Sequence, residues 1–394
     1  MRGSCKRGNR VIWSAPFRPF YFAASFYAPL LVIAWVGPYL GLWADPQSEV
    51  PLPLRHGHEF IFGFCAAIIT GFVLTALPSW AGTKEITGRP LMLLALLWLA
   101  GRMAFWASPW LPSLVPAIID GLLLPALFAM VMPQLLRARN KRYLLFLPVL
   151  LALITANLMY HHGLATSDHA QSGQALRLAV YELIVLYVMS GGVLTPLFTG
   201  NVLREKGRGD QTPFSMPLEI AAVGVVLLLA VLDLAAAPPT STGAAALACT
   251  LLHGWRTARW QGWRAADVPL VAVMHLGFAW LILAFALRAM ADLTGLVPAH
   301  AWLHAFAVGS LGLMMLVLMT RVALRHTGRP PVVSPAMLAA YAVMFAAALL
   351  RLAATVLGLG NTVIALAALL WGAAFAMYFG VFWKVLLAPS LPRR

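Results

Sequence analysis

Two histidines, His300 and His304, open an apolar stretch of membrane-spanning length. At a separation of four residues on a helix, both imidazoles lie on one face, one turn apart. Neutral imidazole is the most common metal ligand among side chains, and it is also an axial ligand of haem iron. No charged residue follows until Arg321, where a basic group closes the stretch. This pattern indicates a membrane helix with a metal- or haem-binding end.

Other titratable side chains also fall in apolar surroundings. Such groups are costly inside a membrane, and they usually face the interior of a helix bundle or a wet cavity. For any single residue the alternative is a structural ion pair or an interfacial position. The candidate metal ligands are His56, His58, His161, His162, His275, His300 and His304. The carboxylates that could transfer protons are Glu59, Asp120 and Glu182.

Five arginines stand apart from the remaining basic residues, because they fall at or inside the opposite ends of their helices. They are Arg55, Arg102, Arg177, Arg288 and Arg351. Arginine binds carboxylates in bidentate pairs. Together with the histidines, they predict a polar chamber near one membrane face.

The composition fixes the elements that must position these groups. Of 394 residues, 61% are hydrophobic and only 10% are charged, which excludes a soluble domain with a wetted surface. We predict an all-α polytopic membrane protein with about twelve transmembrane helices, each of roughly 20 residues. The expected spans are 20–43, 57–81, 90–108, 113–136, 142–162, 176–200, 216–237, 241–260, 268–293, 298–321, 334–357 and 360–384.

The charge distribution predicts the topology. Of the 28 Lys and Arg residues, the 23 other than the five arginines named above fall on alternate loops, so the N- and C-termini are expected in the cytoplasm. The net charge of +15 therefore requires no nucleic acid partner. We expect one transmembrane helical bundle domain over residues 1–394, with a short N-terminal segment 1–19 and a short C-terminal tail 385–394. The three cysteines are far apart and predict neither a disulfide nor a thiolate site.

Several segments resemble the NnrS family of bacterial inner-membrane proteins, which are associated with nitric oxide metabolism and nitrosative stress. The similar segments are APFRPFYF from Ala15, HGHEFIFGFCAAIITGFVLTALPSWAG from His56, HLGFAWL from His275 and HAFAVGSLGLMMLVLMTRVALRHTGRP from His304. The resemblance covers essentially the whole chain. One position departs from it, because Val193 follows Gly191 and Gly192 where the family usually has arginine.

The resemblance implies haem, with haem b as the expected form, and copper as cofactors. Joined to the residue pattern, it predicts haem iron and copper in the outer half of the bundle. The ligands would be imidazoles of the second, fifth and tenth helices, and Arg102, Arg288 or Arg351 would hold the haem propionates. The cofactor-binding candidates are His56, His58, His300, His304 and these three arginines. The expected surroundings are the bilayer of the bacterial inner membrane.

Three functional classes fit these observations. The first is an oxidoreductase, similar to a nitric oxide reductase, that binds or reduces nitric oxide with electrons from quinol or another donor. The second is a sensor or sequestering protein for nitric oxide or iron. The third is a transporter of copper, haem or a nitrosyl complex, although the sequence lacks the obvious inverted repeat that many transporters carry.

Overall fold

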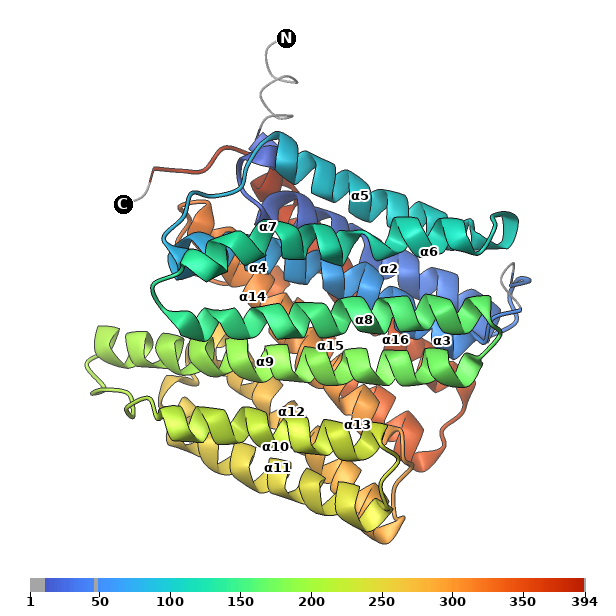
Figure 1. Cartoon of the computed structure of the whole chain (residues 1–394). Helices are drawn as coiled ribbons and strands as arrows, with labels where there is room; N and C mark the ends of the chain where they lie inside the picture. The colour runs from blue at the N-terminus through green and yellow to red at the C-terminus, as the bar shows by residue number, and fades with distance from the viewer. Residues whose placement is uncertain (1–10, 46–48, 393–394) are drawn as a thin grey trace. The chain divides into compact units, whose positions relative to one another are not determined.

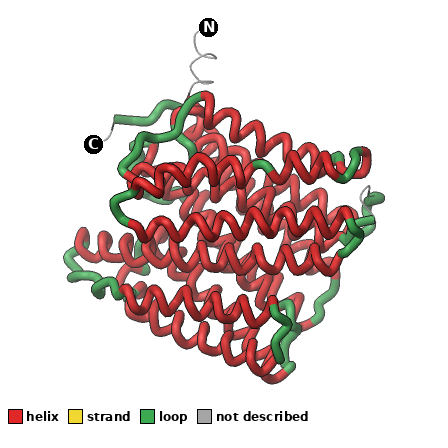
Figure 2. The backbone as a smooth tube through the Cα atoms, viewed as in Figure 1, coloured by secondary structure: helices red, strands yellow, loops and turns green. Residues whose placement is uncertain are grey.

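The computed structural model describes residues 11–45 and 49–392, and within these ranges the ordered elements are all helical (Figure 2). The long helices follow the predicted spans closely (Figure 1). The α-helices, long and short, are α2 (Phe17–Tyr39), α3 (Leu52–His58), α4 (Ala66–Ala81), α5 (Arg89–Trp106), α6 (Leu114–Gly121), α7 (Leu123–Arg137), α8 (Phe146–Ala165), α9 (His169–Glu205), α10 (Met216–Leu234), α11 (Pro239–Arg259), α12 (Pro269–Thr294), α13 (Ala301–His304), α14 (Gly312–His326), α15 (Pro335–Leu357) and α16 (Asn361–Leu387).

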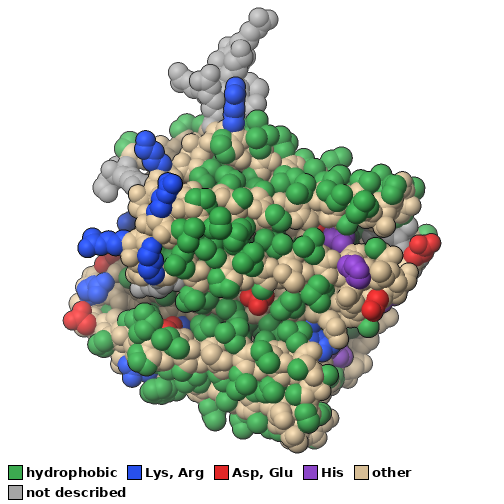
Figure 3. Space-filling model, in the orientation of Figure 1, with side chains coloured by type: hydrophobic (Ala, Val, Ile, Leu, Met, Phe, Trp, Pro, Cys, Tyr) green, Lys and Arg blue, Asp and Glu red, His purple; other side chains and the backbone are tan. Residues whose placement is uncertain are grey.

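Eleven spans of the described chain are long and apolar enough to cross a membrane, which confirms a polytopic membrane protein. The exception among the twelve predicted spans is α11. It is a helix of 21 residues, but its sequence begins Pro-Thr-Ser-Thr and ends with Arg256 and Arg259, so it is less apolar than the others. This helix packs along α12 over most of its length. On the face shown in Figure 3, hydrophobic side chains cover the sides of the helices, while most charged side chains lie near helix ends.

Helix α9 begins at His169, well before the expected start at residue 176. Asp168 explains the difference, because its carboxylate accepts a hydrogen bond from the backbone N–H of Gln171 at 2.9 Å. Such a cap satisfies a donor that the first helical turn leaves unpaired. A search for apolar residues alone misses this polar first turn.

The chain clusters into two compact units. Unit 1 comprises residues up to Glu182, Val322–Pro330 and the chain from Tyr378 onward. Unit 2 comprises Leu183–Arg321 and Pro331–Met377. Three helices, α9, α14 and α16, therefore contribute residues to both units.

Unit 1 joins the two ends of the chain through one buried side chain. Arg18, at the start of α2, is 1% exposed and donates to the backbone oxygens of Leu386 at 2.7 Å and Ala388 at 2.8 Å. It also donates to the hydroxyl of Ser390 at 2.9 Å. The last carbonyls of a helix lack partners within the helix and carry a partial negative charge. Arg18 thus caps the final helix and fixes α2 beside it.

Two helices contain a π-helical turn at a corresponding place. One such turn, Glu59–Cys65, follows His58 directly, and the other, Ala305–Leu311, follows His304 directly. Both segments read His-x-Phe-x-x-Gly, so Gly63 and Gly309 occupy the same position in their turns. π-Helical turns are rare and are found frequently at functional sites. The tenth and second predicted spans therefore share a local backbone feature as well as a histidine.

The Arg18 cap generates the first prediction. Arg18→Gln should lower the stability of the protein by about 3 kcal/mol, because a buried charged donor to several oxygens is lost. Thermal unfolding in detergent measures the change. Arg139→Gln, on an exposed arginine, is the matched control and should leave the melting temperature nearly unchanged. Equal melting temperatures for the two variants would contradict the role assigned to Arg18.

Candidate functional site

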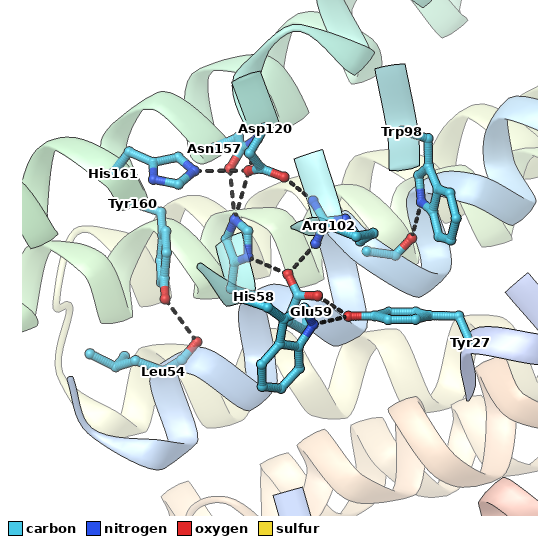
Figure 4. A network of polar contacts seen from close by, with 12 residues as sticks. Tyr27, Leu54, His58, Glu59, Trp98, Arg102, Asp120, Asn157, Tyr160 and His161 are labelled. Carbon is cyan, nitrogen blue, oxygen red and sulfur yellow. Dashed lines mark hydrogen bonds and ion pairs between the residues drawn. The ribbon is translucent and has the colours of Figure 1, made fainter. Parts of the chain in front are cut away.

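A buried polar cluster lies within unit 1, among helices that are otherwise apolar (Figure 4). Its members come from α2, the α3 helix and the π-helical turn that follows it, α5, α6 and α8. The residues are Tyr27, His58, Glu59, Arg102, Asp120, Asn157 and His161. Five of them, His58, Glu59, Arg102, Asp120 and His161, belong to the candidates predicted from the sequence, and the structure brings these five together.

Arg102 connects the two acidic groups of the cluster. Its Nη1 donates to Glu59 Oε1 and its Nη2 donates to Asp120 Oδ1. The arginine is 4% exposed and the carboxylates are 1% and 3% exposed, so all three are removed from solvent. Buried charges are stable only when they are paired and hydrogen-bonded. One guanidinium facing two carboxylates leaves a formal charge of −1 when both histidines are neutral.

His58 lies between acceptors on both edges of its ring. Its Nδ1 is 3.2 Å from Glu59 Oε1, and its Nε2 is 3.0 Å from Asn157 Oδ1 and 3.1 Å from Asp120 Oδ2. A neutral imidazole carries a single N–H and can satisfy only one edge. The second nitrogen is satisfied by a proton, which makes an imidazolium, by the O–H of a protonated neighbouring carboxyl, or by a metal ion. Each of these also offsets the excess negative charge of the cluster.

A metal ion fits this donor set. Ligand atoms of His58, Asp120 and His161 all lie within 4.8 Å of one another, and His161 Nε2 is 2.8 Å from Asp120 Oδ2. Two imidazoles and one carboxylate form a ligand set typical of non-haem iron, and imidazole also suits zinc and copper. Metal-bound histidines usually donate their other N–H to a carboxylate. Glu59 is placed to accept that bond from His58.

A haem does not fit at His58. Phe105 stacks on one face of the imidazole with ring centroids 4.5 Å apart and an interplanar angle of 6°. Tyr160 stacks at 4.3 Å and 27°, and the side chain of His58 is 0% exposed. An axial ligand must point one nitrogen at a space as large as a porphyrin. Both nitrogens of His58 instead face protein atoms at hydrogen-bonding distance.

Aromatic residues complete the surroundings of Glu59. The hydroxyl of Tyr27 donates to Glu59 Oε2, and the indole N–H of Trp106 donates to the Tyr27 oxygen at 2.8 Å. Trp98 donates to the backbone oxygen of Gly63 at 2.8 Å in the π-helical turn. A side chain at position 63 would meet Arg102, because an added Cβ would lie 2.9 Å from Nη1. The glycine in the His-x-Phe-x-x-Gly segment thus makes room for the guanidinium.

The other candidates of the second, fifth and sixth predicted spans lie outside the described contacts of this cluster. His56 packs against Trp35 with ring centroids 4.8 Å apart. The exposed His162 pairs through Nδ1 with Gln171 Oε1 at 2.6 Å. Glu182 is partly buried on α9. The two adjacent histidines of α8 therefore have different environments, with His161 inside and His162 outside.

The remaining candidate ligands, His275, His300, His304, Arg288 and Arg351, belong to unit 2. His304 Nε2 accepts a hydrogen bond from Arg351 Nη2 at 2.6 Å, and the rings of His300 and His304 are 6.1 Å apart. Partial burial and the nearby Arg351 lower the pKa of His300, which lies just before α13. Arg288 pairs with Asp233 at 2.6 Å and with Asp292 at 2.7 Å. His275 Nε2 lies 2.9 Å from the hydroxyl of Thr199.

Sequence reasoning missed Asn157 and Tyr27 and assigned Asp120 to proton transfer rather than to a ligand set. Asn157 had a recognisable signal, because it is a polar residue in an apolar run and precedes His161 by four positions on the same helix face. Tyr27 had none, since aromatic residues are abundant throughout the chain.

A family model described as NnrS protein matches residues 11–390, nearly the whole chain. The chain belongs to the NnrS family. No curated protein matches it. Two residues of the polar cluster of this NnrS protein, His58 and Glu59, lie in the segment His56–Gly82 that resembles the family, and the chemistry of the cluster is argued from its geometry.

The bridging role of Arg102 generates the second prediction. Arg102→Gln should destabilise the protein by about 3–5 kcal/mol, because two buried carboxylates lose their counter-charge. Adding Glu59→Gln and Asp120→Asn should restore much of the lost stability, since the charges to be compensated are then absent. Thermal unfolding in detergent again gives the values. Arg177→Gln, on an exposed arginine, serves as the control. An equal loss of stability in Arg102→Gln and Arg177→Gln would contradict the bridging role of Arg102.

Proposed function

We propose that this protein is a metal-dependent membrane protein of the nitric oxide response that binds nitric oxide at the His58–Asp120–His161 site. The observation that carries the proposal is the convergence of two imidazole nitrogens and one carboxylate oxygen in a buried cluster of formal charge −1. Membership of the NnrS family supports the link to nitric oxide. A single iron or copper ion is the cofactor proposed for this site.

The chain's own residues would hold and orient the metal. His58, His161 and Asp120 supply the ligand atoms, and Asn157 adds an oxygen 3.0 Å from His58 Nε2. Glu59 fixes the ring of His58, and Arg102 fixes the carboxylate of Asp120. A bound transition metal with three protein ligands supplies an open coordination position for a small diatomic ligand. Burial excludes water and anions that would compete for it.

The closed geometry favours binding over transport. All three ligand residues are buried, at 0%, 3% and 7% exposure for His58, Asp120 and His161. A neutral diatomic molecule can cross an apolar helix bundle, whereas a haem or a hydrated ion requires an opened route. We therefore propose that the protein binds nitric oxide as a sensor or sequestering protein. Binding of nitric oxide is also the first step for an oxidoreductase that receives electrons from quinol or another donor.

The expected haem b is proposed only for a place other than His58, since both nitrogens of that imidazole face protein atoms at hydrogen-bonding distance. We further propose the bacterial inner membrane as the location, with both termini in the cytoplasm. The support is the segregation of Lys and Arg onto alternate loops of a chain with at least eleven apolar spans in its described part.

Metal content tests the ligand assignment. Protein purified in mild detergent should carry about one transition-metal ion per chain. His58→Ala and His161→Ala should each abolish this content, whereas His56→Ala and His162→Ala, on neighbouring histidines outside the cluster, should retain it. Elemental analysis gives the stoichiometry, and an absorption spectrum of the same sample reports haem separately. Full metal content in both cluster variants would refute the site.

Nitric oxide binding tests the function. Under anaerobic conditions, addition of nitric oxide to the reduced protein should produce a paramagnetic nitrosyl signal in electron paramagnetic resonance. The signal should vanish in Asp120→Ala and persist in His162→Ala, because only the first residue belongs to the proposed ligand set. A metal-loaded protein without any nitrosyl signal would retain the metal site but reject nitric oxide as its ligand.

A further inference from the structure

The hydrogen bonds around Glu59 reach beyond the ligand residues of unit 1 (Figure 4). Arg102 Nη1 donates to Oε1 of this carboxylate, and His58 Nδ1 lies 3.2 Å from the same oxygen. The hydroxyl of Tyr27 bonds to the other oxygen, Oε2. One buried carboxylate thus serves three side chains, and these side chains compete for its negative charge.

Trp106 fixes the direction of the bond between Tyr27 and Glu59. The indole N–H of Trp106 donates to the Tyr27 oxygen at 2.8 Å, and an indole nitrogen can only donate. Glu59, ionised opposite Arg102, can only accept. The tyrosine hydroxyl therefore accepts from Trp106 and gives its own proton to Glu59 Oε2. Consecutive hydrogen bonds of this kind polarise one another, so the indole strengthens the donation by the hydroxyl.

Close packing holds the tyrosine in this position. A Cβ added at Gly63 would lie 3.2 Å from Glu59 Oε2 and 3.2 Å from Cε1 of Tyr27. The ring of Trp98 meets the ring of Tyr27 edge to face, with centroids 5.6 Å apart. Trp98 gives its own N–H to the backbone oxygen of Gly63 at 2.8 Å. The tyrosine ring thus lies against both the glycine of the π-helical turn and a tryptophan, and these contacts keep its hydroxyl on Glu59.

The bond from Tyr27 to Glu59 affects how strongly His58 binds a cation. A carboxylate that accepts the N–H of a ligand histidine raises the electron density on the other ring nitrogen. In this site the other nitrogen is Nε2, which faces Asp120 and Asn157. The bond from Tyr27 draws charge to Oε2, so less charge remains on Oε1 to accept from His58. The tyrosine hydroxyl therefore reduces the electron density that His58 donates to a bound metal.

We propose that Tyr27, supported by Trp106, is a positioning residue that weakens the hydrogen bond from His58 to Glu59 and thereby makes nitric oxide binding at the metal site reversible. The second part of this inference rests on the function proposed above. A metal that receives less electron density from its ligands returns less to bound nitric oxide, so nitric oxide leaves more readily. Ready release suits a sensor, whereas reduction of nitric oxide is favoured by an electron-rich metal. The hydroxyl on Glu59 thus favours sensing over reduction.

Nuclear magnetic resonance of the metal-free protein tests the first part. The Nδ1–H proton of His58, identified by its loss in His58→Ala, reports the strength of the bond to Glu59. Tyr27→Phe retains the ring and removes the hydroxyl, so the bond should strengthen and the proton resonance should move downfield. Trp106→Phe should move the resonance in the same direction by a smaller amount. An unchanged or upfield resonance in Tyr27→Phe would overturn the inference.

Two matched variants separate the effect of the hydroxyl from a general change in packing. Tyr160→Phe removes a hydroxyl from a ring that stacks on His58 at 4.3 Å, but this hydroxyl donates to the backbone oxygen of Leu54 at 3.3 Å. Trp98→Phe alters a tryptophan that packs against Tyr27 and donates to a backbone oxygen. Both variants should leave the His58 resonance nearly unchanged. A shift in either as large as in Tyr27→Phe would also overturn the inference.

Release of nitric oxide from the metal-loaded protein tests the second part. In Tyr27→Phe, dissociation should be severalfold slower and the infrared N–O stretching frequency should fall, because the metal returns more electron density to nitric oxide. Metal content should stay at the level of the unmodified protein, which separates this effect from loss of the site. Equal or faster release would overturn the second part. A protein that binds no metal would refute the metal site and this second part, whereas the His58 resonance would still decide the first.

Discussion

The salt bridge from Arg102 to two buried carboxylates is the interaction on which unit 1 depends. Neither Glu59 nor Asp120 is stable as a charge in an apolar bundle alone, and each would repel the other. The guanidinium sets the positions of both, and these positions define the two edges of His58. Two carboxylates and one guanidinium leave one negative charge without a counter-charge, so the site can hold one more cation. The stacked rings of Phe105 and Tyr160 then keep the imidazole in that orientation.

The π-helical turns show how one local element serves two different environments. In unit 1 the residue after the histidine is Glu59, and the arginine of the next helix in the chain pairs with this carboxylate. In unit 2 the corresponding residue is Ala305, and Arg351, also from the next helix in the chain, bonds to His304 itself. Unit 2 has no carboxylate at this position. The guanidinium of Arg351 therefore donates to His304 Nε2, and this nitrogen is not open to a cation.

Much of the fold could be predicted because a bilayer restricts the chain to apolar helices of nearly fixed length. The prediction was weakest where polar residues enter a helix, as in the first turn of α9 and along α11. The candidate site was predictable as a set of residue types, since His58, Glu59, Arg102, Asp120 and His161 are each unusual in a membrane span. Their mutual pairing was not, because it depends on helix rotation and packing. The contrast between His161 and His162 shows this, as only the packing of α8 distinguishes two adjacent histidines.

The discontinuity of unit 1 has a consequence for biogenesis. The carbonyls that Arg18 caps belong to residues synthesised after the whole of unit 2. Until then the guanidinium at the start of α2 must stay at the membrane surface or in contact with water, because a buried arginine without partners is too costly. Helix α2 therefore reaches its final environment later than many helices that follow it in the chain. Unit 1 remains open until the residues that follow unit 2 have been synthesised.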